Sequence, residues 1–356
     1  MKIVTVVGAR PQFIKAAPTS RALRALPGVR ELLVHTGQHY DDAMSSIFFR
    51  ELELPSPDIN LGVGSRTHAA QTAAILTALE PLLIEERPDG VVIYGDTNST
   101  LAGALDAAKL NIPIAHVEAG LRSYNRRMPE EINRVVADSL ASLLFCSSQA
   151  GATNLAREGI TAGVHVVGDV MYDAVLGAAA RSESVETTLL AALGVAPGGY
   201  LLATVHRAAN TDDPTHLAEI VAALNSLDEQ IVFPVHPRTA KALADLSASL
   251  APHVQAVPPV GYLEMVALER NARKILTDSG GLQKEAYWLA VPCVTLRDET
   301  EWVETLDGGW NRLVGTDPAL IRDATAAPRP PGSPPPLYGD GHAAERLAAV
   351  IAAAWA

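Results

Sequence analysis

Carboxylates and guanidiniums alternate densely in residues 116–134, which read HVEAGLRSYNRRMPEEINR. The charged members are Glu118, Arg122, Arg126, Arg127, Glu130, Glu131 and Arg134. An exposed run of this kind is usually a solvated face with weak salt bridges. Here the run follows an apolar, strand-like segment, and ligands bind outside the carboxyl ends of the strands in open parallel sheets. The run is therefore a candidate acid/base site that faces an anionic substrate.

Other reactive side chains also follow segments with the composition of strands. Residues 2–7 lead into a glycine turn that contains Arg10, and Lys15 lies in the opening turns of the next predicted helix. Two cations near a helix N-terminus favour anion binding, although the turn does not match the G-x-G-x-x-G fingerprint of dinucleotide sites. Residues 90–95 lead into Asp96, which adds a carboxylate at a neighbouring strand end.

The predicted strands of the second half are followed by cations and by a second glycine turn. These residues are His206 and Arg207 after 200–205, His236 after 230–235, Ser279, Gly280 and Gly281 after 273–277, and Arg297 after 292–296. A Ser-Gly-Gly sequence at a strand-to-helix junction lets backbone N–H groups approach phosphates closely. It is the strongest local signal in the chain.

Each of these groups also has a simpler interpretation. Asp96 or Ser279 before a helix often only caps it, and a histidine after a strand is often an ordinary loop residue. We favour a functional interpretation because the groups gather at strand ends in both halves. A diphosphate cradle that faces several carboxylates across one cleft suits proton transfer at a carbon beside a phosphate leaving group.

Strand-like and helical segments alternate through the chain, which predicts an α/β fold with parallel sheets covered on both faces. Further strands are expected at 31–36, 113–117, 142–147 and 164–168. At 356 residues the chain suits two domains, and we place the boundary near residue 170. The Pro-rich residues 328–341 can form neither helix nor central strand, because proline lacks the backbone donor. A short apolar helix is expected to close the chain.

The composition excludes several classes of protein. The net charge of −12 argues against nucleic-acid binding, which needs a basic footprint. No window offers the roughly 18 apolar residues of a membrane span, and no secretory signal is recognisable, so we expect a cytoplasmic protein. Cys146 and Cys293 lie in apolar stretches without metal-ligand spacing and are expected to be buried free thiols. No motif predicts a metal site.

A series of motifs extends along the whole chain in one order. They are GARPQFIK, TGQHYD, YGDTNSTLAGA, HVEAGLR, RMPEEINR, ATVHRAAN, PVHPRT, LTDSGGLQKEA, RLVG and PLYGDG. In this the chain resembles the non-hydrolysing UDP-N-acetylglucosamine 2-epimerases. The resemblance implies two Rossmann-like domains in the glycosyltransferase-B arrangement, with the active-site cleft between them. Residues 1–169 and the returning helix 342–356 would form one domain, and residues 170–341 the other. It also implies a homodimer that needs no nicotinamide or metal cofactor.

The same resemblance implies a two-stage reaction for surface polysaccharide precursors. The C2 proton is removed as UDP leaves by anti elimination, and UDP re-adds after protonation of the opposite face of C2. The implied roles are acid/base for Asp96, Glu118 and Glu130, orientation for Arg134, assistance to the departing diphosphate for His206, and UDP binding for Arg10, Lys15, Ser279, Gly280, Gly281, Glu285 and Arg297. Which carboxylate serves which face stays open, and Glu131 is expected to be structural.

Three alternatives remain at this stage. Some motifs also resemble the branch that acts on UDP-2,3-diacetamido-2,3-dideoxyglucuronate, whose carboxylate Arg126 and Arg127 could bind. A glycosyltransferase on the same fold is a rival from another class. A regulatory site for a second UDP-N-acetylglucosamine is a further hypothesis by analogy. Its residues would be Gln38, His39, Arg66, Arg207 and His236.

Overall fold

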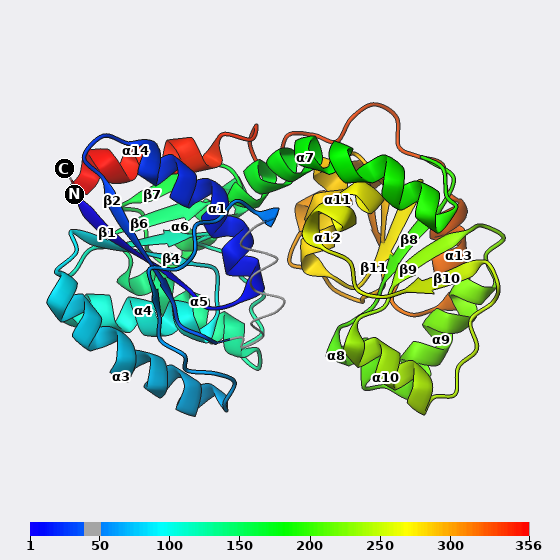
Figure 1. Ribbon diagram of the computed structural model, residues 1–356, viewed down its shortest axis with the longest axis horizontal. Coiled ribbons are helices and arrows are strands. Elements are labelled where there is room, and N and C mark those ends of the chain that lie inside the picture. The colour runs from blue at the N-terminus through cyan, green and yellow to red at the C-terminus, as the bar shows by residue number, and fades with distance from the viewer. Residues whose placement is uncertain (39–50, 356) are drawn as a thin grey trace. The chain divides into compact units, whose positions relative to one another are not determined.

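The computed structural model describes residues 1–38 and 51–355 and divides the chain into two compact units (Figure 1). The first unit consists of Met1–Leu176 together with Pro336–Ala356, and the second of Gly177–Pro335. The division falls inside the long helix α7 (Val170–Leu193) and within the Pro-rich segment. Each unit has its own sheet and its own apolar core.

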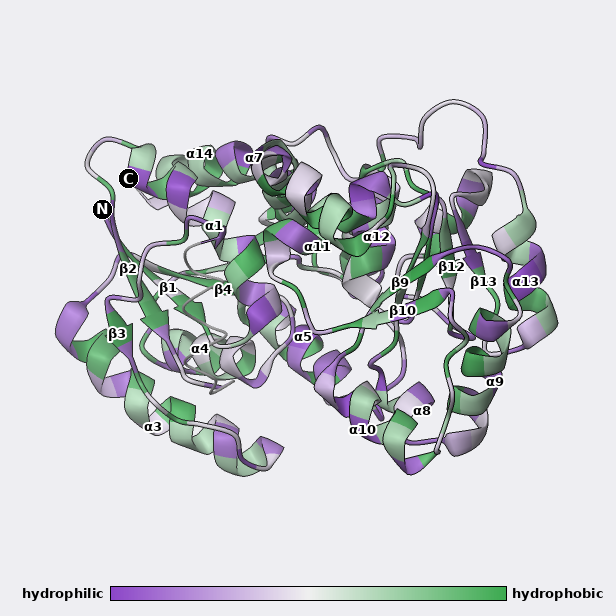
Figure 2. Ribbon diagram, turned by 45° about the vertical axis from the view of Figure 1, so that its right-hand side comes forward, coloured by the Kyte–Doolittle hydropathy of each residue, from purple (hydrophilic) through white to green (hydrophobic). Residues whose placement is uncertain are grey.

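The first unit is built on a seven-stranded parallel sheet with the order β3-β2-β1-β4-β5-β6-β7. The strands are β1 (Lys2–Val7), β2 (Arg30–His35), β3 (Ile59–Asn60), β4 (Gly90–Tyr94), β5 (Ile114–Val117), β6 (Leu143–Cys146) and β7 (Val164–Val166). The central strands are almost continuous apolar runs because helices cover both faces of the sheet (Figure 2). The order reverses between β1 and β4, so the turns after these two strands flank the switch point where ligands bind in such sheets.

The helices of the first unit are α1 (Arg10–Ala25), α3 (His68–Glu86), α4 (Asn98–Lys109), α5 (Pro129–Leu140), α6 (Gln149–Arg157) and α14 (Ala343–Trp355). The C-terminal helix α14 runs beside α1 (Figure 1). Leu347 and Ile351 on α14 are fully buried, and the Trp355 ring occupies the space where a side chain on Gly90 would lie. The last helix is therefore an integral layer of the first unit.

The second unit repeats the plan with a six-stranded parallel sheet of order β10-β9-β8-β11-β12-β13. Its strands are β8 (Leu201–Thr204), β9 (Ile231–Pro234), β10 (Val254–Val257), β11 (Lys274–Thr277), β12 (Cys293–Thr295) and β13 (Asn311–Leu313). Its helices are α8 (Ala208–Thr211), α9 (Pro214–Asn225), α10 (Pro237–Asp245), α11 (Tyr262–Asn271), α12 (Gly280–Trp288), α13 (Pro318–Ala326) and the 3-10 helix η1 (Val303–Gly309). The order reverses between β8 and β11.

The structure confirms the strands expected from the sequence and adds β3, β10 and β13. All three lie at sheet edges and lack an apolar run, so periodicity does not reveal them. Residues 328–341 contain neither helix nor strand, as expected. Both cysteines are buried and free, as predicted, and burial raises the pKa of each thiol to about 12. Across the described ranges, no helix has the length and apolar character needed to cross a bilayer.

Candidate active site

Asp96 lies at the switch point of the first sheet, in the turn between β4 and α4. The Gln12 side chain links the ends of β1 and β4. Its Oε1 accepts hydrogen bonds from Gly8 N (2.7 Å) and Ala9 N (3.1 Å), and its Nε2 donates to the Tyr94 carbonyl (2.9 Å). Thr97 caps α4 by accepting from Thr100 N. Asp96 is therefore fixed between the ends of β1 and β4.

The Asp96 carboxylate is ion-paired with Arg134 of α5. Burial raises the pKa of Asp96, and this effect outweighs the lowering by the Arg134 charge. Asn133 also donates to the Asp96 backbone carbonyl at 2.9 Å. A carboxyl group that holds its proton to a higher pH, in contact with a fixed guanidinium, has the character of an acid/base group.

Glu118 follows β5 and is buried in an ion pair with Lys15 of α1. Its backbone has φ = 70°, a left-handed conformation that costs on the order of 1 kcal/mol in a residue other than glycine. A Cβ on Gly95 would lie 3.2 Å from Glu118 Oε2 and 3.3 Å from Lys15 Nζ. The glycine before Asp96 thus leaves room for this ion pair, which brings the two carboxylates to one place.

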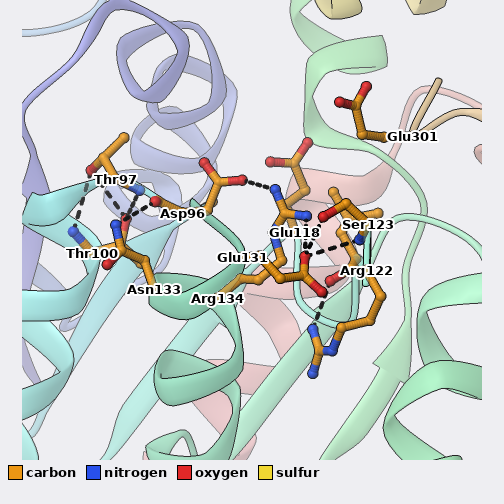
Figure 3. A network of polar contacts seen from close by, with 12 residues as sticks. Asp96, Thr97, Thr100, Glu118, Arg122, Ser123, Glu131, Asn133, Arg134 and Glu301 are labelled. Carbon is orange, nitrogen blue, oxygen red and sulfur yellow. Dashed lines mark hydrogen bonds and ion pairs between the residues drawn. The ribbon is translucent and has the colours of Figure 1, made fainter. Parts of the chain in front are cut away.

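Glu130 and Glu131 are adjacent in sequence and have different surroundings. Glu131 is buried and accepts hydrogen bonds from Ser123 N, Ser123 Oγ and Tyr124 N, each at 2.9 Å, and from Arg134 Nη1 at 2.8 Å. Burial would raise its pKa, but these bonds hold it below the usual value. Glu130 is exposed in the first turn of α5. Figure 3 shows Arg134 reaching Asp96 on one side and Glu131 on the other.

In the second unit, the β11–α12 turn forms a helix N-terminus with open backbone donors. Ser279 is the N-cap, and its hydroxyl accepts a hydrogen bond from Leu282 N at 3.4 Å. Gly280 and Gly281 follow as the first helical residues, and a Cβ at either position would have no heavy-atom neighbour closer than 3.4 Å. The space outside the turn suits a phosphate group, because the helix dipole and the backbone N–H groups favour an anion there.

Asp278 joins the ends of β8 and β11 just before this turn. It is fully buried and accepts hydrogen bonds from His206 N (3.0 Å), Arg207 N (2.9 Å) and Asn210 Nδ2 (3.1 Å). His206 Nδ1 lies 3.3 Å from the same carboxylate. Burial opposes ionisation of Asp278, yet the His206 bond and charge keep its pKa below the usual value. Asp278 therefore orients His206, whose side chain is 37% exposed.

Two further predicted residues of the second unit are Arg297, which follows β12, and Glu285 on α12. Arg297 donates to both oxygens of Glu301, at 2.9 and 3.1 Å, and burial of Glu301 is outweighed by this pairing, which lowers the pKa of the carboxyl. Glu285 is buried on α12, with Tyr262 Oη at 3.4 Å from its Oε1. Arg297 thus supplies a paired cation, and Glu285 supplies a buried hydrogen-bond acceptor on the helix that the Ser-Gly-Gly turn opens.

Comparison with known proteins places the chain in one family. The sequence profile described as UDP-N-acetylglucosamine 2-epimerase matches residues 21–352. The chain belongs to the UDP-N-acetylglucosamine 2-epimerase family. A Methanococcus maripaludis protein named UDP-N-acetylglucosamine 2-epimerase homolog is 50% identical, with 99% of each chain covered. The UDP-2,3-diacetamido-2,3-dideoxy-D-glucuronate 2-epimerase of Pseudomonas aeruginosa is 46% identical, again with 99% of each chain covered.

Solved structures agree with this membership. The UDP-GlcNAc 2-epimerase of Methanocaldococcus jannaschii, in complex with UDP-GlcNAc and UDP, superposes with a TM-score of 0.89 at 41% identity, covering 99% of this chain and 100% of that one. The Neisseria meningitidis enzyme bound to UDP-GlcNAc also reaches 0.89, at 28% identity and the same coverage. The predicted class is confirmed: an α/β isomerase with two Rossmann-like parallel-sheet domains of the glycosyltransferase-B type.

Within this epimerase, the structure brings some of the predicted site residues together. Asp96, Glu118 and Arg134 share one network, and Lys15, predicted to bind UDP, is the ion-pair partner of Glu118. Arg10 is exposed at the start of α1.

The predicted regulatory residues are dispersed over both units. Gln38 Oε1 accepts from Ser99 N (3.0 Å) and Ser99 Oγ (2.7 Å), and exposed Arg66 donates to the Val63 carbonyl at 3.1 Å. His236 caps α10 in the second unit and its ring lies 5.8 Å from that of His206. His39 lies outside the described residues.

Sequence reasoning missed His116, Asp138 and Asp278. Asp278 carried a signal, since it stands between a strand and the Ser-Gly-Gly turn. His116 was visible as a polar residue inside an apolar strand. Asp138 lies in a helix interior, where only its burial in the folded chain distinguishes it.

Proposed function

We propose that this enzyme interconverts UDP-N-acetylglucosamine and UDP-N-acetylmannosamine by inversion at C2. The observation that carries the proposal is the adjacency of two carboxylates in unlike environments, buried Glu118 and partly exposed Asp96. Asp96 contacts Arg134 and has a raised pKa, whereas Glu118 is held by Lys15. An inversion needs acid/base groups on both faces of one carbon, and unlike surroundings separate their protonation states.

The chemistry proceeds by elimination and re-addition. A carboxylate takes the proton from C2, the C–H electron pair becomes the C1=C2 double bond, and the C1–O bond to UDP breaks to give 2-acetamidoglucal. A second acid then protonates the opposite face of C2 as the diphosphate oxygen re-forms its bond to C1. Asp96, Glu118 and Glu130 supply the acid/base groups in this proposal, and Arg134 orients Asp96.

The second unit supplies most of the residues predicted to bind UDP, while Arg10 and Lys15 belong to the first. The open N–H groups after Ser279 and the Arg297 guanidinium are suited to the diphosphate, and His206 is suited to stabilise the departing oxygen. Asp278 holds His206 in place for this role, because its carboxylate lies 3.3 Å from His206 Nδ1. Buried Glu285 is suited to accept from the ribose hydroxyls.

A second candidate substrate has a specific observation in its favour. A relative 46% identical over 99% of each chain acts, by its name, on UDP-2,3-diacetamido-2,3-dideoxy-D-glucuronate. Arg126 and Arg127 are exposed in the loop before α5 and could pair with a uronate carboxylate. Offering each sugar nucleotide separately and following C2 by proton NMR decides between them. We expect inversion of UDP-N-acetylglucosamine, and inversion of the uronate alone would assign the enzyme to the other branch.

A glycosyltransferase on the same fold is the rival of another class. In D2O the epimerase incorporates deuterium at C2 of recovered UDP-sugar, because the proton is exchanged during inversion. A transferase leaves C2 unlabelled, and that result would overturn the proposed function.

The biological setting follows from the same proposal. The enzyme would act in the cytoplasm, and its product would serve surface polysaccharide synthesis. It would act as a homodimer, and light scattering after gel filtration tests this oligomeric state directly.

Regulation by a second UDP-N-acetylglucosamine is a separate hypothesis. It predicts sigmoidal kinetics in the direction that starts from UDP-N-acetylmannosamine, with activation by traces of the other epimer.

A further inference from the structure

A buried charge cluster lies beside the carboxylates of the first unit and has no part in the chemistry proposed above. It consists of His116 on β5, Asp138 on α5, Arg122 in the intervening loop and Glu158 after α6. The side chains of His116, Asp138 and Arg122 are at most 1% exposed. Charged groups are rarely placed this deep unless they are fully paired.

Both ring nitrogens of His116 face hydrogen-bond acceptors. Nδ1 lies 2.7 Å from Asp138 Oδ1, and Nε2 lies 2.7 Å from the carbonyl oxygen of Gly95. A backbone carbonyl and an ionised carboxylate have no proton to donate. A neutral ring carries one N–H, so one of these short contacts would then join two lone pairs. Protons on both nitrogens satisfy both contacts.

The surroundings of Asp138 favour its ionised form. Its Oδ2 accepts from Arg122 Nη1 at 2.7 Å and from Gly120 N at 3.1 Å, in addition to the His116 contact on Oδ1. Burial alone would raise the pKa of Asp138, but the bonds and charges of His116 and Arg122 hold it below its usual value. A protonated Asp138 would lose the attraction of the Arg122 guanidinium. The ion pair of imidazolium and carboxylate is therefore the better description.

The four side chains balance each other in charge. His116 and Arg122 are the cations, and Asp138 and Glu158 are the anions. Arg122 joins the two anions, because it donates to Glu158 Oε1 and Oε2 at 2.7 and 2.6 Å as well as to Asp138. A buried cation at position 116 is thus compensated within its own contact shell.

This cluster forms hydrogen bonds with the backbone next to Asp96 and next to Glu118. The Gly95 carbonyl, held by His116, belongs to the peptide bond that leads into Asp96. The Gly120 amide, held by Asp138, lies two residues beyond Glu118. Gly95, Glu118 and Gly120 all have left-handed backbone, with φ of 60°, 70° and 81°. Such conformations persist where the surrounding contacts over-determine them.

We infer that the His116–Asp138 ion pair is a positioning device that fixes Asp96 and Glu118 for proton transfer at C2. The inference rests on the proposed function, because it takes these two carboxylates as the acid/base groups. Neither His116 nor Asp138 needs to touch the substrate. The imidazolium sets the peptide before Asp96, and its counterion sets the turn that carries Glu118. One ion pair therefore governs the spacing of two acid/base groups.

The kinetic test is Asp138→Asn. With its oxygen toward Arg122 and Gly120, the amide presents its NH2 group to His116 Nδ1, so the ring can keep this contact only by giving up a proton and its charge. Displacement of reacting groups by about 1 Å costs on the order of 10²-fold in rate, so we expect kcat to fall by about that factor. KM and the affinity for UDP should stay within about twofold, because the proposed diphosphate groups belong to the other unit.

A matched control is Asp106→Asn. Asp106 is also a buried carboxyl of the first unit, on α4, and lies outside the cluster. Its variant should keep wild-type kcat and KM. An unchanged kcat in Asp138→Asn, or a loss of UDP affinity equal to the loss of kcat, would overturn the inference.

A second measurement does not depend on any variant being active. Nitrogen-15 NMR of selectively labelled histidine in the wild-type enzyme reports how many ring nitrogens carry protons. The signal is identified by its disappearance in His116→Gln or its shift in Asp138→Asn. We expect protons on both ring nitrogens, as the two contacts to acceptors require, and a ring with one proton would overturn the inference even if the variants failed to fold.

Failure of the proposed function and failure of the positioning role give different results. Wild-type enzyme that leaves C2 unlabelled in D2O would refute the proposed function. Wild-type exchange at C2 combined with full turnover in Asp138→Asn would refute the positioning role alone.

Discussion

At the carboxyl ends of its strands the first unit gathers carboxylates, whereas the second gathers glycines and cations. In the first, Asp96 and Glu118 are each held in an ion pair, and Gly95, Glu118 and Gly120 have left-handed backbone. In the second, neither Gly280 nor Gly281 has positive φ, and the turn simply opens a helix. Two sheets with the same kind of switch point thus carry different groups there: carboxylates in the first unit, and a glycine turn with cations in the second. The sheet topology sets where a site can form, and the few residues after each strand determine its chemistry.

The largest effect expected from this comparison is on turnover, through Glu118→Gln. The amide keeps the size of the side chain and removes its ability to take or give a proton. General acid/base groups contribute about 10²–10⁴-fold, so we expect kcat to fall roughly 10³-fold. UDP affinity by isothermal titration calorimetry should be unchanged. Wild-type turnover in this variant would remove Glu118 from the mechanism.

In the second unit, Gly280→Ala should weaken the binding of UDP, whereas Glu118→Gln in the first unit should reduce turnover and leave UDP affinity unchanged. The added Cβ would lie no closer than 3.4 Å to its nearest neighbours, Arg207 Nη2 and Trp302 Nε1, so the fold should tolerate it. The methyl group would occupy space that a phosphate needs near the helix N-terminus. We expect UDP to bind about 10-fold more weakly, equivalent to one hydrogen bond of about 1.4 kcal/mol, with an unchanged thermal midpoint. Wild-type affinity for UDP would show that the diphosphate does not use this turn.

A paired substitution separates chemistry from structure within the first unit. Glu131→Gln should lower the free energy of unfolding by about 2–3 kcal/mol, because Glu131 accepts four hydrogen bonds in a buried setting. Glu130→Gln, at an exposed position, should change it by less than about 0.5 kcal/mol while reducing kcat. Urea denaturation measures the free energy of unfolding of both variants.

The pH dependence of this pair has a definite sign. The pKa of Glu131 is lowered by folding, so its stabilisation is present above its unfolded pKa and is lost as pH falls through the folded pKa. The difference between wild type and Glu131→Gln should therefore shrink in acid. Equal destabilisation by both variants at neutral pH would contradict the distinction between the two glutamates.

The smallest effect concerns a buried carboxyl away from the strand ends. Burial, followed by the charge of Glu80, raises the pKa of Asp106 from 3.8 to about 7. The folded state keeps this proton while the unfolded chain loses it near pH 4, so stability falls as pH rises from about 4 to about 7. Asp106→Asn should remove that fall and gain on the order of 1 kcal/mol at pH 8 in thermal unfolding, with no gain at pH 4. A gain of the same size at both pH values would contradict the raised pKa.

The sequence reveals much of this fold because apolar strands, glycine turns and helix starts are local signals. It locates Asp96, Glu118 and Ser279 at strand ends for the same reason. It could not show that Lys15 pairs with Glu118, since that contact joins residues 103 positions apart. Short edge strands such as β13 depend on pairing with a neighbour and not on their own composition.

The cluster around His116 illustrates the same limit for the site. His116 and Asp138 are 22 residues apart, on a strand and on a helix, and only the folded chain brings them to 2.7 Å. Nothing in the local pattern of either segment indicates a partner. Long-range ion pairs that shape a site are therefore read from the structure, whereas the groups proposed to act on the substrate stand out in sequence because they follow strands.

In the proposed mechanism, loss of the C2 proton and departure of UDP are parts of one reversible reaction. The direct test uses UDP-N-acetylglucosamine that carries oxygen-18 in the bridge between C1 and the β-phosphorus, incubated with wild-type enzyme in D2O. We expect deuterium at C2 in both epimers by proton NMR, together with migration of the label from the bridge to non-bridging β-phosphate positions by phosphorus NMR. Deuterium at C2 with the label still in the bridge, or no deuterium at all, would contradict this mechanism.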